Sequence, residues 1–139
     1  MWNTACPDWE ERLLAGRSLV PDLPLFTSER DRALRVFNRL RLADVVGQPR
    51  MEEAAGDWFR DIVAALFGSL DPETGRRMIQ EAFLLVPKGN SKTTYAASTM
   101  LTAIIVNKRP AAEFVLVAPT INIAARAYNQ AKGAIRADP

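Results

Sequence analysis

The residues best suited to chemistry lie in one short segment, residues 86–93. It reads Val-Pro-Lys-Gly-Asn-Ser-Lys-Thr and stands between a continuous apolar run and a helical pattern. Backbone N–H groups at such a junction, together with the helix N-terminus, cradle phosphate oxygens in phosphate-binding loops. In those loops a lysine reaches the terminal phosphates and the next hydroxyl holds Mg²⁺, and Lys92 and Thr93 fit these roles. The order of residue types therefore predicts a phosphate-binding loop.

The segment departs from the usual pattern G-x-x-x-x-G-K-[ST], because Val86 and Ser91 occupy the two glycine positions. We expect Asn90 to supply the left-handed conformation that the loop needs, with Gly89 sharing that task. A second interpretation explains the same residues as a helix capped by Asn90 or Ser91, with Lys92 solvated. Spacing alone leaves both interpretations open.

The composition excludes several other kinds of site. The chain has no histidine and one cysteine, Cys6, so Ser-His-Asp triads, His-based zinc sites and internal disulfides are ruled out. The net charge of +2 is too small to argue for a nucleic-acid or membrane partner. Residues 1–80 hold 11 basic and 13 acidic side chains, whereas residues 81–139 hold 7 basic and 3 acidic ones. Positive charge thus collects in the part that contains the loop.

Neither a leader nor a membrane span is expected. Residues 1–11 contain no Lys or Arg, so a secretory signal is not indicated. The longest uncharged stretch, residues 93–107, has 15 residues. That is short of the roughly 20 apolar residues needed to cross a bilayer. We expect a soluble protein of the cytoplasm.

The first part of the chain has helical periodicity. Residues 1–27 are expected to form an arm, with a short helical pattern at residues 9–14. Apolar residues recurring up to Leu40 predict an amphipathic helix for which Thr27 or Ser28 supplies the cap. A broad apolar stripe predicts a second helix over residues 52–68, with Gly68 as its C-terminal cap.

From residue 82 onward the pattern becomes that of an α/β protein. The continuous apolar runs 82–86 and 114–118 are typical of strands buried on both faces. Helical patterns follow them, over about 92–106 and 122–135. We therefore predict an α/β fold: a P-loop NTPase-type parallel sheet, incomplete and of β-α-β-α order, preceded by a helical N-terminal segment. The domain boundary is placed between residues 1–75 and 76–139.

Residues 81–94, Glu-Ala-Phe-Leu-Leu-Val-Pro-Lys-Gly-Asn-Ser-Lys-Thr-Thr, resemble the divergent Walker A segment of the tailed-bacteriophage terminase large subunit. That family is the ATP-driven motor and nuclease that packages DNA into capsids. In it, a Val-Pro-Lys/Arg-x-Asn-x-Lys-Ser/Thr loop replaces the glycine-rich one. Residues 40–49 and 58–68 resemble the family's N-terminal helices, and residues 117–120 with 129–131 resemble the segment after its second strand. The resemblance runs from about residue 8 to residue 139.

The resemblance implies a site for ATP and Mg²⁺. Lys92 would bind the β and γ phosphates, and Thr93 would ligate Mg²⁺ through its hydroxyl. Lys88 stands where the family keeps a basic residue, so it is either a catalytic residue that senses the γ-phosphate or a solvated lysine. The implied cofactor-binding residues are Pro87, Lys88, Gly89, Asn90, Ser91, Lys92, Thr93 and Thr94.

The resemblance also implies a function and partners. The function is the ATP-binding portion of a motor that couples ATP hydrolysis to translocation of double-stranded phage DNA into the capsid. The partners are that DNA, the portal protein, the small terminase subunit and other copies in a homo-oligomeric ring, without a membrane. Two alternatives stay open: a non-catalytic remnant that acts only as a binding or structural piece, and another P-loop enzyme such as a small-molecule kinase.

Parts of the family's machinery are missing from the chain. Phosphoryl transfer in these ATPases needs an apolar strand that ends in Asp and is followed by Glu. Asp44 follows a helical pattern and Asp138 ends one, so neither supplies this acid. The family's nuclease domain, with its metal-binding aspartates, is also absent. We therefore expect the chain to be an opening piece of a large subunit.

Three further residues allow two interpretations each, and two more allow one. Trp58 and Phe59 stand where relatives read adenine, but core packing is the favoured explanation for both. Thr120 follows a strand pattern, where α/β sites collect, and is at least as well explained as a helix cap. Arg126 and Lys132 are interpreted as solvated side chains of the last helix.

Overall fold

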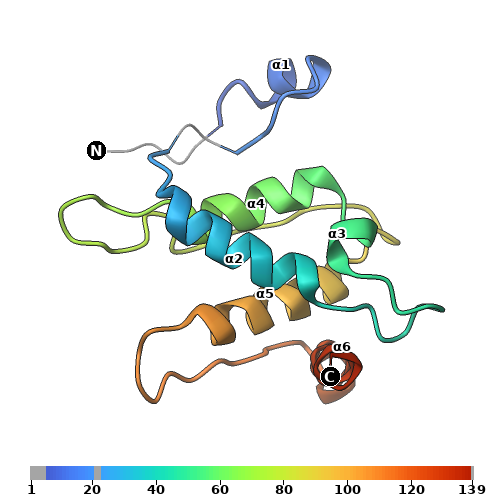
Figure 1. Cartoon of the computed structure of the whole chain (residues 1–139). Helices are drawn as coiled ribbons and strands as arrows, with labels where there is room; N and C mark the ends of the chain where they lie inside the picture. The colour runs from blue at the N-terminus through green and yellow to red at the C-terminus, as the bar shows by residue number, and fades with distance from the viewer. Residues whose placement is uncertain (1–5, 21–22, 139) are drawn as a thin grey trace. The chain divides into compact units, whose positions relative to one another are not determined.

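The computed structural model describes residues 6–20 and 23–138. The described residues contain six helices (Figure 1): α1 (Trp9–Leu14), α2 (Thr27–Arg39), α3 (Met51–Ala54), α4 (Asp57–Gly68), α5 (Lys92–Val106) and α6 (Ile121–Ala137). Contacts group the chain into two compact units. The first unit is Met1–Leu34 with Gly56–Phe83, and the second unit is Arg35–Ala55 with Leu84–Pro139. The predicted domain boundary after residue 75 stays a prediction.

Most helices lie where the periodicity predicts them. The pattern at residues 9–14 forms α1, and the next amphipathic pattern forms α2, whose first two helical residues are Thr27 and Ser28 rather than caps that precede it. Ala33 and Phe37 are both fully buried, since residues four apart share one face of a helix. The helical N-terminal segment is therefore confirmed.

The prediction of one helix over residues 52–68 is wrong, because two helices occupy this range. Ala55 and Gly56 have extended conformations, with ψ of 139° and 147°, and separate α3 from α4. Glycine is a favourable N-cap, and Asp57 in the next position interacts well with the positive end of α4. The apolar stripe continues across the break, which is why the sequence resembles a single helix.

Gly68 is the last residue of α4 rather than a left-handed cap. A Cβ atom added at this position would lie 2.9 Å from the Cβ of Arg30 and 3.0 Å from Cδ2 of Leu25. The backbone N–H of Phe26 donates to the Gly68 carbonyl at 2.8 Å. Gly68 is therefore needed for the close approach of the chain before α2 to the end of α4.

The core of the first unit lies along α4, where Phe59, Val63 and Phe67 are each at most 4% exposed. After α4, residues 69–78 turn back on themselves around Asp71. The guanidinium of Arg77 then lies 4.5 Å from the centre of the Phe67 ring. Burial lowers the pKa of Arg77, and the nearby carboxylate of Glu29 opposes that shift.

The core of the second unit forms where α6 packs on α5. Leu101 and Thr102 of α5 are buried, as are Ala131 and Ala134 of α6. In Figure 1, α6 is seen end-on while α5 runs across the view, so the two helices cross steeply. Alanines on the buried face of α6 permit this close crossing.

The predicted parallel sheet is wrong. No sheet forms within residues 6–20 and 23–138, where the only strand-like pairings are three isolated antiparallel bridges. The runs 82–86 and 114–118 are irregular and largely exposed, with Phe83 at 90%, Leu85 at 84% and Val117 at 88%. A strand exists only when its N–H and C=O groups pair with a neighbour, and these runs pair neither with each other nor with another described segment. The observed order is therefore irregular run, α5, irregular run, α6.

Candidate functional site

The loop before α5 has the backbone shape that its residues allow. Gly89 has φ of +95°, which is readily accessible only to glycine, and Ser91 has φ of 51° in the left-handed region. Helix α5 then begins at Lys92, and the N–H of Tyr95 donates to the Ser91 carbonyl at 2.9 Å. The turn between residue 87 and α5 thus uses two left-handed residues separated by one ordinary one.

The expectation that Asn90 supplies the left-handed conformation is wrong, whereas the share given to Gly89 is confirmed. The Asn90 side chain instead donates from Nδ2 to the Pro87 carbonyl at 3.1 Å. This bond closes the loop across three residues. Ser91 takes the strained position, and its hydroxyl makes no capping bond to α5.

The side chain of Lys92 folds back over the loop. Its Nζ donates to the carbonyl of Val86 and to that of Pro87, both at 2.8 Å. An ammonium group has three protons, so these two bonds leave one for a further acceptor. The loop therefore holds the positive charge at its centre. The interpretation of Lys92 as a merely solvated side chain does not account for these two contacts.

Residues 88–94 line a hollow of about 440 Å³. Lys88, Lys92 and Thr93 are exposed there, and the N-terminus of α5 opens onto the same space. The lining contains two lysines and no carboxylate. The first backbone N–H groups of a helix have no partner within it, and the helix dipole adds positive potential. The charges and donors of the hollow suit an anion such as phosphate.

The strained serine leads to a prediction about stability. Replacing Ser91 with Gly should raise the free energy of unfolding by about 1 kcal/mol, because glycine removes the left-handed penalty and no capping bond is lost. Replacing it with Val should lower that free energy by more than about 1 kcal/mol. Urea unfolding measures both changes.

Ser28→Gly is the matched control, because Ser28 lies in the first turn of α2. Glycine is a poor helix former, so this change should lower the free energy of unfolding by roughly 0.5 kcal/mol. A loss of stability in Ser91→Gly equal to that in Ser28→Gly would contradict the left-handed assignment.

The remaining candidate residues have different roles in the structure. Thr120 caps α6, and its side chain accepts a bond from the N–H of Ile123 at 3.4 Å, so the cap interpretation is confirmed. Phe59 is buried as expected, but Trp58 is 43% exposed and meets Phe59 edge-on, so core packing of Trp58 is wrong. Arg126 and Lys132 are exposed, as predicted.

A second hollow was not predicted. It has about 580 Å³ and is lined by residues 43–48, in the turn between Arg41 and Arg50. Gly47 and Gln48 have φ of 82° and 45°, and a Gly-Gln-Pro sequence signals the turn but not the hollow. Its single carboxylate, on Asp44, accepts a hydrogen bond from Gln130 at 2.6 Å. The loop before α5 carries more groups that can bind a ligand.

No protein family, curated protein or solved structure matches the chain. The candidate site therefore rests on its own residues. In the part of the chain that the structure describes, no group of three or more Cys, Asp or Glu side chains could hold a metal ion. Thr93 is the one side chain of the 88–94 hollow that the sequence assigned to Mg²⁺. None of the described helices is long and apolar enough to span a bilayer.

Proposed function

We propose that residues 87–94 bind the phosphates of ATP together with Mg²⁺, and that the chain is the ATP-binding portion of a phage DNA-packaging motor. The observation that carries the first part is the loop geometry. The N-terminus of α5, the ammonium of Lys92 and the hydroxyl-bearing Thr93 border one hollow. The second part is supported by the resemblance of residues 81–94 to the terminase Walker A segment.

In this proposal the phosphate oxygens become hydrogen-bond acceptors for Lys92. The Nζ of Lys92 turns from the Val86 and Pro87 carbonyls toward the phosphate oxygens, or uses its remaining proton for them. Thr93 supplies a hydroxyl to Mg²⁺, which neutralises phosphate charge when bound. Lys88 adds positive charge on the exposed side of the loop.

The proposed setting follows the resemblance. The motor couples ATP hydrolysis to translocation of double-stranded DNA, with the portal protein and the small terminase subunit as partners and a homo-oligomeric ring as its assembly. It works in the host cytoplasm. These statements go beyond the proposed nucleotide site. If they are wrong, the proposal that residues 87–94 bind ATP still stands.

One observation favours a second candidate, a piece that binds nucleotide or a partner without turnover. The residues that line the loop hollow include no carboxylate, so none of them can supply an acidic ligand to Mg²⁺ or a carboxylate base to the attacking water. The two candidates differ in hydrolysis rather than in binding.

Calorimetric titration with a non-hydrolysable Mg-ATP analogue tests the nucleotide site. Lys92→Ala should weaken binding by roughly tenfold to a hundredfold, since a charged hydrogen bond contributes about 1.5–3 kcal/mol. Lys108→Ala is the matched control, because Lys108 is an exposed lysine of the same unit outside the loop. Equal affinity of the unchanged chain and Lys92→Ala would refute the proposed site.

A further inference from the structure

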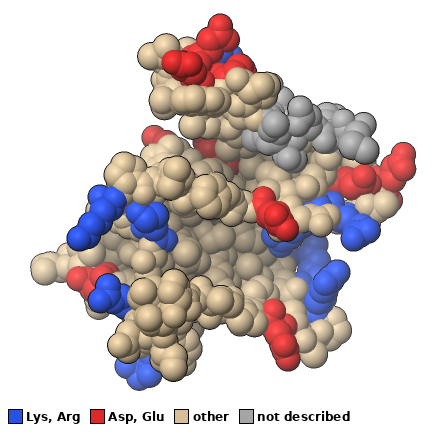
Figure 2. Space-filling view, turned by 180° about the vertical axis from the view of Figure 1, so that it is seen from behind, with Lys and Arg blue, Asp and Glu red and all other residues tan. Residues whose placement is uncertain are grey.

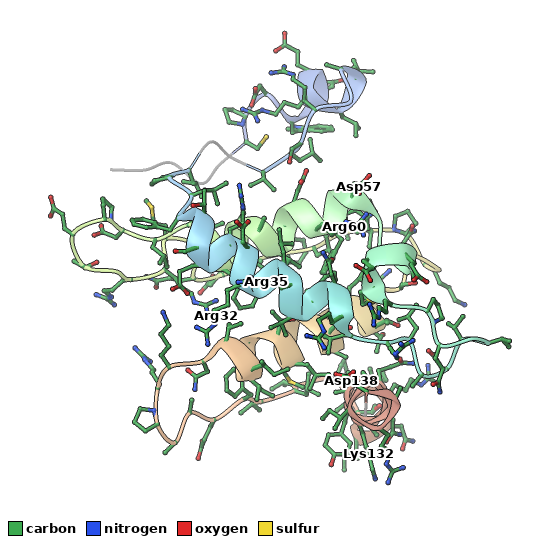
Figure 3. The ribbon with its side chains drawn as sticks, in the orientation of Figure 1. Arg32, Arg35, Asp57, Arg60, Lys132 and Asp138 are labelled. Carbon is green, nitrogen blue, oxygen red and sulfur yellow. The ribbon has the colours of Figure 1, made fainter. Side chains whose placement is uncertain are left out.

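Three arginines of α2 lie in a row along one side of the helix. Arg32, Arg35 and Arg39 follow one another at spacings of three and four residues, so at 3.6 residues per turn they fall within about 60° around the helix axis. Arg35 and Arg39 are exposed and Arg32 is half-buried, and Figure 3 shows Arg32 and Arg35 at neighbouring positions along α2. The buried residues Ala33 and Phe37 leave the helix on a different side. We call the three arginines the arginine row.

The arginine row has no partner among the residues that the structure describes. None of its three side chains makes a hydrogen bond or an ion pair there. The two carboxylates of α2 have other partners. Asp31 accepts a hydrogen bond from Nε of Arg30 at 2.8 Å, and the charge of Glu29 acts on Arg77. Like charges three or four residues apart on a helix repel each other, so the row costs helix stability unless an anion lies against it.

Helix α2 alone carries as much net charge as the whole chain. It holds four arginines and two carboxylates, a net charge of +2. Other segments are acidic. Glu10 and Glu11 lie in the first turn of α1, and acidic side chains stand out on this segment at the top of Figure 2. The small total charge of the chain therefore conceals a basic surface on α2 that can attract a polyanion.

The surroundings of the arginine row indicate which kind of polyanion fits. Within α2, all of which the structure describes, no large apolar side chain is exposed. A helix that binds a lipid surface needs apolar side chains that enter it, and a protein interface needs an apolar anchor. Single-stranded nucleic acids are bound largely by aromatic side chains on which bases stack. The phosphate backbone of a duplex needs only positive charge and hydrogen-bond donors, which is what the row offers.

We propose that the arginine row binds the phosphate backbone of duplex DNA. From Arg32 to Arg39 the row rises about 10 Å, and one DNA strand carries a phosphate about every 3.4 Å along the axis, so the row matches about three phosphates. A guanidinium group donates two parallel hydrogen bonds to a phosphate. Such contacts do not read the bases, so binding should be independent of DNA sequence. Duplex DNA is the partner named in the proposed function, on which this contact therefore rests, but neither ATP nor the loop before α5 takes part.

Fluorescence anisotropy of a labelled DNA duplex of about 20 base pairs, titrated with the full chain in the absence of nucleotide, tests the contact. We expect the logarithm of the affinity to fall linearly with the logarithm of the salt concentration, because each arginine–phosphate contact releases counterions. The triple change R32Q/R35Q/R39Q should weaken binding by at least about tenfold at about 50 mM salt. It should also reduce the slope by about 2.7, or about 0.9 for each contact. R32K/R35K/R39K should keep the slope, because lysine retains the charge.

The matched control is R17Q/R109Q/R126Q, which removes the same charge from three exposed arginines on separate segments and should leave the slope unchanged. Circular dichroism checks that each variant keeps its helices. An equal loss of slope in this control and in R32Q/R35Q/R39Q would show that only total charge matters, and would overturn the proposal. The same holds for absence of duplex binding at about 50 mM salt, for tighter binding to a single strand of the same length, and for binding to anionic lipid vesicles that depends on the row.

The DNA titration and the nucleotide titration can fail separately. A chain that binds the Mg-ATP analogue through Lys92 but does not bind the duplex refutes the DNA surface alone. A chain that binds the duplex through the arginine row but does not bind the analogue refutes the ATP site alone.

Discussion

Phe37→Ala is expected to lower the free energy of unfolding by about 3–5 kcal/mol, the usual loss for a phenylalanine in a core. Phe37 is fully buried on α2. Phe83 is 90% exposed, so Phe83→Ala should change that free energy by less than about 0.5 kcal/mol. The two variants delete the same side chain, so the comparison isolates burial. Urea unfolding of both variants beside the unchanged chain measures the difference.

This comparison also tests the corrected fold. A strand over residues 82–86 buried on both faces would make Phe83 as costly to remove as Phe37. The irregular, exposed run makes it nearly neutral. Equal losses in the two variants would therefore contradict the helical structure and favour the sheet that the sequence suggests.

Hydrolysis of Mg-ATP by the chain is expected to stay well below about one turnover per second, a rate that phosphotransferases commonly exceed. The hollow at residues 88–94 offers positive charge and hydroxyls but no carboxylate to orient the attacking water. Phosphate binding without that group leaves the barrier close to that of the uncatalysed reaction. Phosphate release by the purified chain, with and without Lys92→Ala, measures the rate.

Turnover that reaches about one per second and disappears in Lys92→Ala would show that an acid from elsewhere completes the site. Residual hydrolysis that is equal in both chains would instead be a contaminant and would agree with the expectation. Because binding is measured separately by titration, a chain that binds without turnover agrees both with an ATP-binding portion that lacks the catalytic acid and with the non-catalytic alternative.

Local patterns predicted the helices well. The spacing of Ala33 and Phe37, and the capping residue Thr120, describe interactions within a few residues of one another, so they can be recognised without knowing the fold. The break at Gly56 was missed because the apolar stripe continues through it. Gly68 was assigned to a cap because its close approach to Leu25 and Arg30 depends on a distant part of the chain.

In the loop before α5, too, the sequence predicted some features correctly and others wrongly. Its composition indicated a phosphate-binding turn and located Lys92 at the start of a helix, which the structure confirms for α5. Which residue becomes left-handed was misjudged: Ser91 takes that conformation, while the Asn90 side chain donates to the Pro87 carbonyl. The conformation of each residue depends on the hydrogen bonds that close the loop over residues 86–91. These bonds cannot be predicted from the conformational preferences of single residues.

Strands differ from helices in what specifies them. A helix satisfies its backbone within its own segment, so α5 and α6 could be recognised from their sequences. A strand needs a second segment beside it, and an apolar run states only that burial is favourable. Residues 82–86 and 114–118 have the composition of strands, but no described segment pairs with them, and they stay irregular. The local spacing of apolar residues therefore determined where the helices lie. Whether a sheet forms was decided only by the tertiary structure, because a strand needs a second segment beside it.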